Sequence, residues 1–176
     1  MIQHLQTERL HLRKMTTNDA ASLFTIWSDP EVTEFMNISN FTTQDQTEEM
    51  ITFLDQLAQD HKAIRFSIIE KMTGEIIGSC GYNSLDFENE KAEIGYEIAR
   101  DHWGKGYAPE AISSLIDYAF NTLHFHRIEA KVGPENVNSI KVLDKLGFIH
   151  EGTLRQCEKS KDSFIDLNMY SRLKTD

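Results

Sequence analysis

Cysteine and proline are scarce in this chain of 176 residues, and each scarcity excludes a class of protein. The two cysteines, Cys80 and Cys157, are isolated and form no Cys-x-x-Cys pair, which argues against a disulfide-held scaffold and a thiol-based redox or zinc site. Three prolines, no internal repeat and no low-complexity tract leave little room for a linker. We therefore expect a single domain over residues 1–176, which is long enough to bury a core of its own.

Long apolar runs are missing as well. No stretch approaches the roughly 20 apolar residues that a membrane-spanning helix needs. The opening residues, Met1 to Glu8, lack the charged start and the continuous apolar segment of a secretory signal. The sequence therefore predicts a cytoplasmic protein with no membrane partner.

Basic residues are outnumbered by acidic ones. Lysine and arginine total 18 against 28 aspartates and glutamates, so the formal net charge is -10. Nucleic-acid binding usually needs clustered lysine and arginine, and no nucleic-acid partner is expected. Such a charge favours a cationic partner, an amine or a basic peptide, although it also serves solubility alone.

The apolar spacing predicts alternating strands and helices. Period-two alternation and short apolar runs favour strands, and apolar residues three and four apart favour helices. The predicted strands are residues 8–14, 64–70, 76–83, 92–99, 127–132, 148–154 and 163–173. The predicted helices are residues 20–27, 43–60, 109–121 and 138–146. In the second helix we expect an inward face made of Met50, Ile51, Phe53, Leu54 and Leu57.

The order of these elements predicts the fold class. Residues 64–99 hold three strands at hairpin spacing, which is typical of an antiparallel meander. The strand, helix and strand between residues 92 and 132 imply a parallel pair joined by a right-handed crossover. The expected architecture is a mixed, mainly antiparallel α/β sheet with helices on both faces.

A glycine-rich turn, Trp103-Gly-Lys-Gly-Tyr-Ala-Pro-Glu-Ala, joins a predicted strand to a predicted helix. Gly104 and Gly106 allow a tight turn and a close approach by a ligand. The free N–H groups and the positive end of the helix favour an anion. Neither NAD nor ATP is indicated, because Pro109 replaces the third glycine of a dinucleotide motif and Lys105 is not followed by serine or threonine. The turn therefore either binds a phosphate or only connects the strand to the helix.

A second block, Gly133 to Phe148, contains Asn136 and Ser139 and ends in Leu-Gly-Phe. Together the two blocks resemble the GNAT superfamily of N-acetyltransferases, the first its pyrophosphate-binding turn and the second its Asn-x-x-Ala/Ser helix. The closer resemblance is to the branch that acetylates the N-terminal alanine or serine of ribosomal proteins. That branch typically carries Gly-Tyr on its fourth strand and opens with Thr-Glu-Arg-Leu-x-Leu-Arg, here Gly95-Tyr96 and residues 7–13.

The resemblance implies the GNAT fold, whose fourth and fifth strands splay apart, and acetyl-CoA as the acetyl donor without a metal. The main chain at Glu97, Ile98 and Ala99 would then bind the pantetheine arm and the acetyl oxygen. The turn would bind the pyrophosphate, although Asp101 replaces the glutamine or arginine that often begins it. The coenzyme-binding residues implied are Ile98, Ala99, Trp103, Gly104, Lys105, Gly106, Tyr107, Ala108, Asn136 and Ser139.

Acetyl transfer from a thioester needs a neutral amine, donors for the oxyanion and a proton for the departing thiolate. Many GNAT enzymes supply that proton from a tyrosine four residues after Ser139, where this chain has Leu143. The ribosomal-protein branch suggests a serine instead, so Ser139 is the predicted acid, with water or a plain helix-capping role as alternatives. Glu97 is the predicted base, or it only attracts the cationic acceptor. Further acidic candidates are Glu158, Asp162 and Asp166.

The acceptor is the least determined part. The resemblance implies a primary amine, first of all the α-amino group of a protein such as a ribosomal protein. A polyamine, an amino-sugar antibiotic or an amino acid are alternatives, as is an acyl-CoA sensor without catalysis. Trp27, Phe35 and Phe41 either line an acceptor pocket or belong to the core. His124 and His126 lack further ligands at metal spacing, and no metal site is expected. The oligomeric state stays open, a homodimer included.

Overall fold

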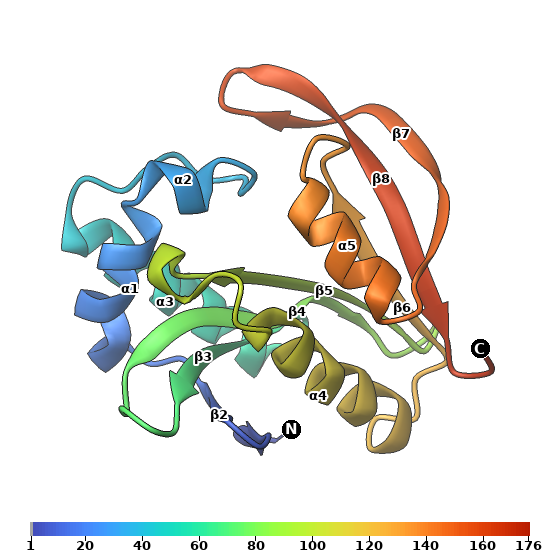
Figure 1. The fold of residues 1–176 in the computed structure, drawn as a ribbon, viewed down its shortest axis with the longest axis horizontal. Coiled ribbons are helices and arrows are strands. Elements are labelled where there is room, and N and C mark those ends of the chain that lie inside the picture. The colour runs from blue at the N-terminus through green and yellow to red at the C-terminus, as the bar shows by residue number, and fades with distance from the viewer. Residues whose placement is uncertain (1) are drawn as a thin grey trace.

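A mixed sheet of eight strands organises the computed structural model, which describes residues 2–176 (Figure 1). The strands lie in the order β1-β2-β3-β4-β5-β6-β8-β7, and only β5 and β6 run parallel. They are β1 (His4–Gln6), β2 (Leu10–Lys14), β3 (Ile64–Glu70), β4 (Ile76–Asp86), β5 (Lys91–Ile98), β6 (Arg127–Val132), β7 (Ile149–Ser160) and β8 (Ser163–Leu173). This is the mainly antiparallel arrangement that the sequence predicts.

Helices cover both faces of the sheet. The cluster of buried side chains from α4 and α5 packs on one face, and the cluster from α1 and α3 lies on the other. The helices are α1 (Ala20–Trp27), α2 (Pro30–Thr33), α3 (Gln44–Gln59), α4 (Tyr107–Asn121) and α5 (Val137–Lys145), with 3-10 turns at Thr17–Asp19 and Arg100–His102. The short elements β1 and α2 are absent from the sequence prediction.

The start of α2 explains how a proline both ends one helix and begins the next. α1 ends at Trp27, before Pro30, as expected. Pro30 then occupies the first position of α2, where a missing N–H costs little. The side chain of Asp29 caps this helix by accepting a hydrogen bond from the Glu31 N–H at 3.0 Å.

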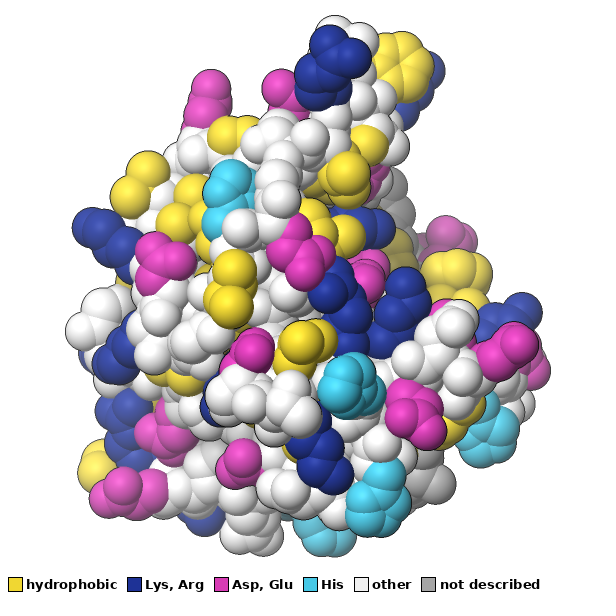
Figure 2. Space-filling view, turned by 90° about the vertical axis from the view of Figure 1, so that its right-hand side faces the viewer, with side chains coloured by type: hydrophobic (Ala, Val, Ile, Leu, Met, Phe, Trp, Pro, Cys, Tyr) yellow, Lys and Arg dark blue, Asp and Glu magenta, His cyan; other side chains and the backbone are white. Residues whose placement is uncertain are grey.

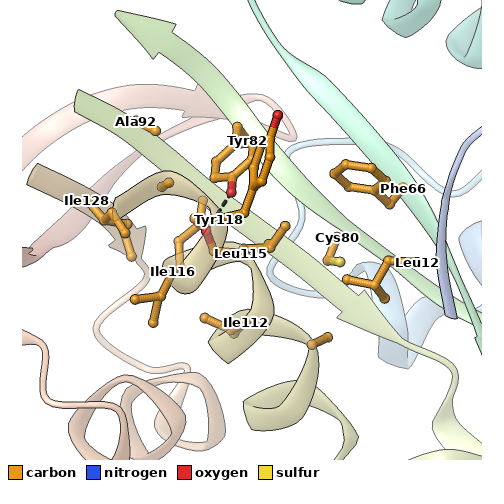
Figure 3. Packing of buried hydrophobic residues seen from close by; sticks show 14 of the residues in the cluster. Leu12, Phe66, Cys80, Tyr82, Ala92, Ile112, Leu115, Ile116, Tyr118 and Ile128 are labelled. Atoms are coloured by element: carbon orange, nitrogen blue, oxygen red, sulfur yellow. Dashed lines mark hydrogen bonds between the residues drawn. The ribbon is translucent and has the colours of Figure 1, made fainter. Parts of the chain in front are cut away.

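The core between the sheet and α4 is built from apolar residues that lie three and four positions apart on the helix. Ile112, Leu115, Ile116 and Ala119 are all buried, and Figure 3 shows the first three beneath Tyr82 of β4. The Tyr82 hydroxyl donates to the Leu115 carbonyl at 2.5 Å, which satisfies the one polar group of this ring inside an apolar cluster.

The prediction that Phe53 belongs to the inward face of α3 is wrong. Phe53 on α3 is 59% exposed, whereas Ile51 is buried. The buried stripe of α3 runs through Thr47, Ile51 and Ala58, at spacings close to whole helical turns. A residue two positions after Ile51 lies on the far side of the helix, so Phe53 points away from this stripe.

The separation of β5 from β6 is the feature that positions the site. The two strands pair only at Lys91 with Arg127, Ala92 with Ile128 and Glu93 with Glu129. Beyond Glu93, β5 continues to Ile98 beside β4, and among residues 2–176 it has no strand partner on the β6 side. These are the fourth and fifth of the predicted strands, and their predicted splay is confirmed.

We expect Leu115→Ala to lower the free energy of unfolding by about 2–5 kcal/mol, because it opens a cavity in the centre of the core. Phe53→Ala is the matched control and should change it by no more than about 0.5 kcal/mol, since Phe53 lies on the surface. Urea unfolding of both variants measures the difference, and equal losses would contradict the assigned orientation of α3.

Candidate active site

A cavity of about 390 Å³ lies where β5 and β6 diverge. Its walls come from β5, β6, the start of α5, the segment from α1 to α3, and β7. Glu97 and Ser139, the two predicted catalytic residues, both line it. The fold therefore brings together two side chains that are far apart in the sequence.

Some main-chain N–H and C=O groups of β5 pair with β4, and others face the side on which β6 diverges. The Ala99 N–H donates to the Ile77 carbonyl of β4 at 2.7 Å. Because antiparallel pairing alternates along a strand, the main-chain groups of Ile98 and Tyr96 face the diverging side instead. The Ile98 carbonyl accepts from the Trp103 indole N–H at 2.7 Å, which leaves the Ile98 N–H directed toward the splay.

The glycine turn has the shape that the sequence suggests. Gly104 and Gly106 have φ of 75° and 79°, in the left-handed region that favours glycine. Gly106 is the N-cap of α4, which begins at Tyr107, slightly earlier than predicted. The Lys105 side chain is exposed and Ala108 half-buried, whereas Tyr107 is buried and its hydroxyl donates to Glu70.

Arg9 holds this turn from the β1–β2 side, a contact that sequence reasoning missed. Its guanidinium donates to the Lys105 carbonyl at 2.8 Å, pairs with Glu110 at 2.7 Å and lies 4.4 Å from the Tyr107 ring centre. The pairing offsets the negative charge of Glu110 in the first turn of α4. The Thr-Glu-Arg motif at residues 7–9 was the sequence signal for this contact. Its first residue takes part as well, since the Thr7 hydroxyl donates to Glu110 at 2.5 Å.

The start of α5 places Ser139 opposite a tyrosine of β5. Asn136 is the N-cap, and its side-chain oxygen accepts a hydrogen bond from the Ser139 N–H at 3.3 Å. The Ser139 hydroxyl lies 2.7 Å from the Tyr96 hydroxyl. Burial raises the pKa of Tyr96 above its usual value, although the hydrogen bond with Ser139 opposes this. Leu143, one turn further along α5, is buried in the core.

The Glu97 carboxylate is enclosed by donors. It accepts a hydrogen bond from the Trp27 indole at 2.8 Å and another from the Ser79 hydroxyl, and it forms an ion pair with Arg65. Only 5% of Glu97 is exposed, so this paired charge forms part of the cavity wall.

Glu93 lies four residues before Glu97 on β5 and lines the same cavity. Burial raises the pKa of Glu93, and Lys131 of β6, 3.7 Å away, only partly opposes this. Its carboxyl is thus easier to protonate than a carboxyl in water, which is the property a proton acceptor near neutral pH needs. Sequence reasoning gave Glu93 no role.

The opposite wall of the cavity is largely apolar. Trp27 and Phe35 contribute to it, whereas Phe41 packs edge-on against Trp27, with ring centres 5.9 Å apart, and does not line the cavity. Glu158 lines the cavity, and Asp162 and Asp166 do not.

The β7–β8 hairpin extends toward the α2 region (Figure 1). The Lys161 ammonium at its tip donates to the carbonyls of Thr33 and Glu34, at 2.6 and 3.1 Å. The Asn37 amide donates to Glu158 of β7. These contacts join the α2 region to the hairpin above the cavity.

On the face shown in Figure 2, acidic and basic side chains are interspersed with apolar ones. Within residues 2–176, no group of three or more His, Cys, Asp and Glu side chains could hold a metal ion. No helix of the same residues is long and apolar enough to cross a membrane.

Comparison with known proteins decides the family. The acetyltransferase (GNAT) domain model matches residues 9–149. The chain belongs to the GNAT acetyltransferases. It is 54% identical over 173 residues to the uncharacterised N-acetyltransferase p20 of Bacillus licheniformis, covering 98% of this chain and 97% of that one. The GNAT resemblance, the GNAT fold and the assignment as an acetyl-CoA-dependent acetyltransferase are thereby confirmed.

Two other relatives are similar to this GNAT chain. The ribosomal-protein-serine acetyltransferase of Escherichia coli is 34% identical over 99 residues, which cover 56% of this chain and 55% of that one. The crystal structure of the ribosomal-protein-S5-alanine acetyltransferase of Vibrio fischeri superposes with a TM-score of 0.84 at 25% identity, over 98% of this chain and 97% of that one.

We expect Arg9→Ala to weaken acetyl-CoA binding by about tenfold, because one charge-assisted hydrogen bond, about 1.5 kcal/mol, no longer fixes the turn. Isothermal titration calorimetry measures the Kd. Arg155→Ala, which removes an exposed arginine of β7, is the control and should leave the Kd unchanged. Equal affinities in both variants would contradict the role of Arg9.

Proposed function

We propose that this GNAT enzyme transfers the acetyl group of acetyl-CoA to the α-amino group of a protein, with a ribosomal protein as the favoured acceptor. The observation that carries this proposal is the cavity at the splay, which is lined from both faces of the sheet. Ser139 and Tyr96 line the side next to α5, and Trp27, Phe35 and Glu93 line the side next to α1 and α3. An acetyl donor and an amine can therefore approach one point from opposite sides.

On the donor side, we assign the main-chain N–H groups of Gly104 to Ala108 to the pyrophosphate, at the positive end of α4. The Trp103 indole binds the Ile98 carbonyl and thereby fixes the main chain of Ile98. We assign the N–H of the same residue to the acetyl oxygen. Such a preorganised donor stabilises the oxyanion that develops in the transition state. Asn136 braces α5 as its N-cap.

On the acceptor side, the amine must lose a proton before it attacks. Glu97 is the proposed base and acts through water, since its three donors leave room for one more. Glu93 is a second candidate, favoured by its raised pKa. Ser139 is the proposed acid that protonates the departing thiolate.

The ribosomal-protein acceptor is supported by the similarity to the serine and alanine acetyltransferases of Escherichia coli and Vibrio fischeri. It is also supported by Arg9 of the branch motif, which contacts the turn directly. The closed hairpin above the cavity admits a slender group such as a chain terminus or a small linear amine more readily than a bulky one.

The acceptor class is tested by the release of coenzyme A thiol from acetyl-CoA. We expect acceptor-dependent release with short peptides that carry ribosomal-protein N-termini. Spermidine and an aminoglycoside are assayed beside them, with the same peptides blocked at the α-amino group as the control. Turnover with the small amines alone would contradict a protein acceptor, and silence with every acceptor would favour an acyl-CoA sensor.

We expect Glu97→Gln to lower kcat by about a hundredfold or more, the usual size of general-base catalysis, with little change in the Kd for acetyl-CoA. Glu93→Gln is the matched variant, and a larger loss there would transfer the role of base to Glu93. Melting temperatures are measured in parallel, because Glu97→Gln also leaves Arg65 without its ionic partner. Unchanged pH profiles in both variants would exclude a base on β5.

A further inference from the structure

The hydrogen bond between Tyr96 and Ser139 links β5 to the first turn of α5 at the cavity. The two hydroxyls are 2.7 Å apart, and both residues line the cavity. Capping does not account for the Ser139 hydroxyl, because Asn136 already caps α5 and accepts from the Ser139 N–H. The hydroxyl is therefore available for chemistry at the splay.

A serine alone is a poor proton donor to a thiolate. A thiol has a pKa of about 8.5, and a phenol one of about 10, whereas an aliphatic alcohol is a far weaker acid than either. A serine can pass its proton to sulfur only if its oxygen regains a proton at the same time. The phenol of Tyr96 is the group in contact with Ser139 that can supply one.

We infer that Tyr96 and Ser139 form a two-hydroxyl relay that protonates the departing thiolate, with Tyr96 as a positioning residue and proton reservoir behind Ser139. This inference rests on the proposed function, because it takes Ser139 as the group next to the sulfur. The phenol that many relatives carry at the position of Leu143 is here replaced by a phenol from the neighbouring strand. Leu143 itself is buried in the core and has no proton to give.

The step balances as follows. The amine nitrogen forms a bond to the acetyl carbon, the carbon–sulfur bond breaks, and its electron pair goes to sulfur. The Ser139 proton moves to sulfur as the Tyr96 proton moves to the Ser139 oxygen. The phenolate of Tyr96 regains a proton through water from the proton that the acceptor nitrogen loses. No oxidant, reductant or metal takes part.

The surroundings of Tyr96 suit a proton that is held until it is needed. The ring packs against the buried cluster under α4 and α5. Burial raises the pKa of Tyr96, so the phenol stays protonated at neutral pH. The charged groups that line the same cavity belong to β3, β5, β6 and β7, and they are Arg65, Glu93, Glu97, Lys131 and Glu158.

Tyr96→Phe tests the relay because it removes one oxygen and keeps the ring. We expect kcat to fall about tenfold or more, within the usual range of general acid catalysis, while the Kd for acetyl-CoA changes less than about twofold. Tyr82→Phe is the matched control, since its hydroxyl bonds to the Leu115 carbonyl inside the core and does not line the cavity. A purely structural role for Tyr96 predicts wild-type kcat in Tyr96→Phe, and that result would overturn the relay.

The double variant separates a relay from two independent roles. If both hydroxyls act in one proton path, the combination of Tyr96→Phe and Ser139→Ala loses no more kcat than Ser139→Ala alone. Losses that multiply would show that the two residues act separately and would contradict the inference.

A second measurement needs no acceptor, so it stands even if the proposed function fails. The thiol of bound coenzyme A is titrated by its ultraviolet absorbance in the wild type, Tyr96→Phe, Ser139→Ala and Tyr82→Phe. Two hydroxyls in series stabilise the thiolate, so the thiol pKa should rise by about one unit, a tenfold change, in Tyr96→Phe and Ser139→Ala. The same thiol pKa in all four proteins would overturn the relay, whereas a lack of turnover with the ribosomal-protein peptides would overturn only the proposed protein acceptor.

Discussion

The parting of β5 from β6 after three paired residues is the constraint on which the rest of the structure depends. It leaves main-chain groups of β5 without a strand partner, and such groups are costly when buried unless something binds them. The fold keeps this gap open because β5 remains fully paired with β4, while α4 and α5 close one face and α1 and α3 the other. A substrate can therefore take the place of a missing strand.

Two ion pairs hold the ends of this gap. Arg65 and Glu97 lie in the wall of the cavity, where the Trp27 indole and the Ser79 hydroxyl complete the set of donors around the carboxylate. Arg9 and Glu110 lie at the glycine turn, where the guanidinium also binds the Lys105 carbonyl. Both pairs join segments that are distant along the chain. Each pair can therefore form only when the strands of the sheet are assembled in their correct order.

Local patterns were sufficient to predict most of the elements and the glycine turn. The inward face of α4 follows directly from residues three and four apart, and Gly104 and Gly106 adopt the positive φ that made them informative. The inward face of α3 was predicted less well, because its apolar residues form a band wider than the buried stripe, and their spacing does not state which edge of the band is exposed. Phe53 was therefore predicted to be buried, whereas the packing of α1 against α3 leaves it exposed.

The sequence by itself determined the family, the fold class and the turn, since these rest on short contiguous motifs whose conformation is set by neighbouring residues. Only the tertiary structure decided that Tyr96 meets Ser139, that Arg9 holds the turn and that Glu97 is enclosed by Trp27, Ser79 and Arg65. The physical reason is that these contacts depend on the register of strands and on the placement of helices over the sheet. Neither is encoded in the spacing of any one segment.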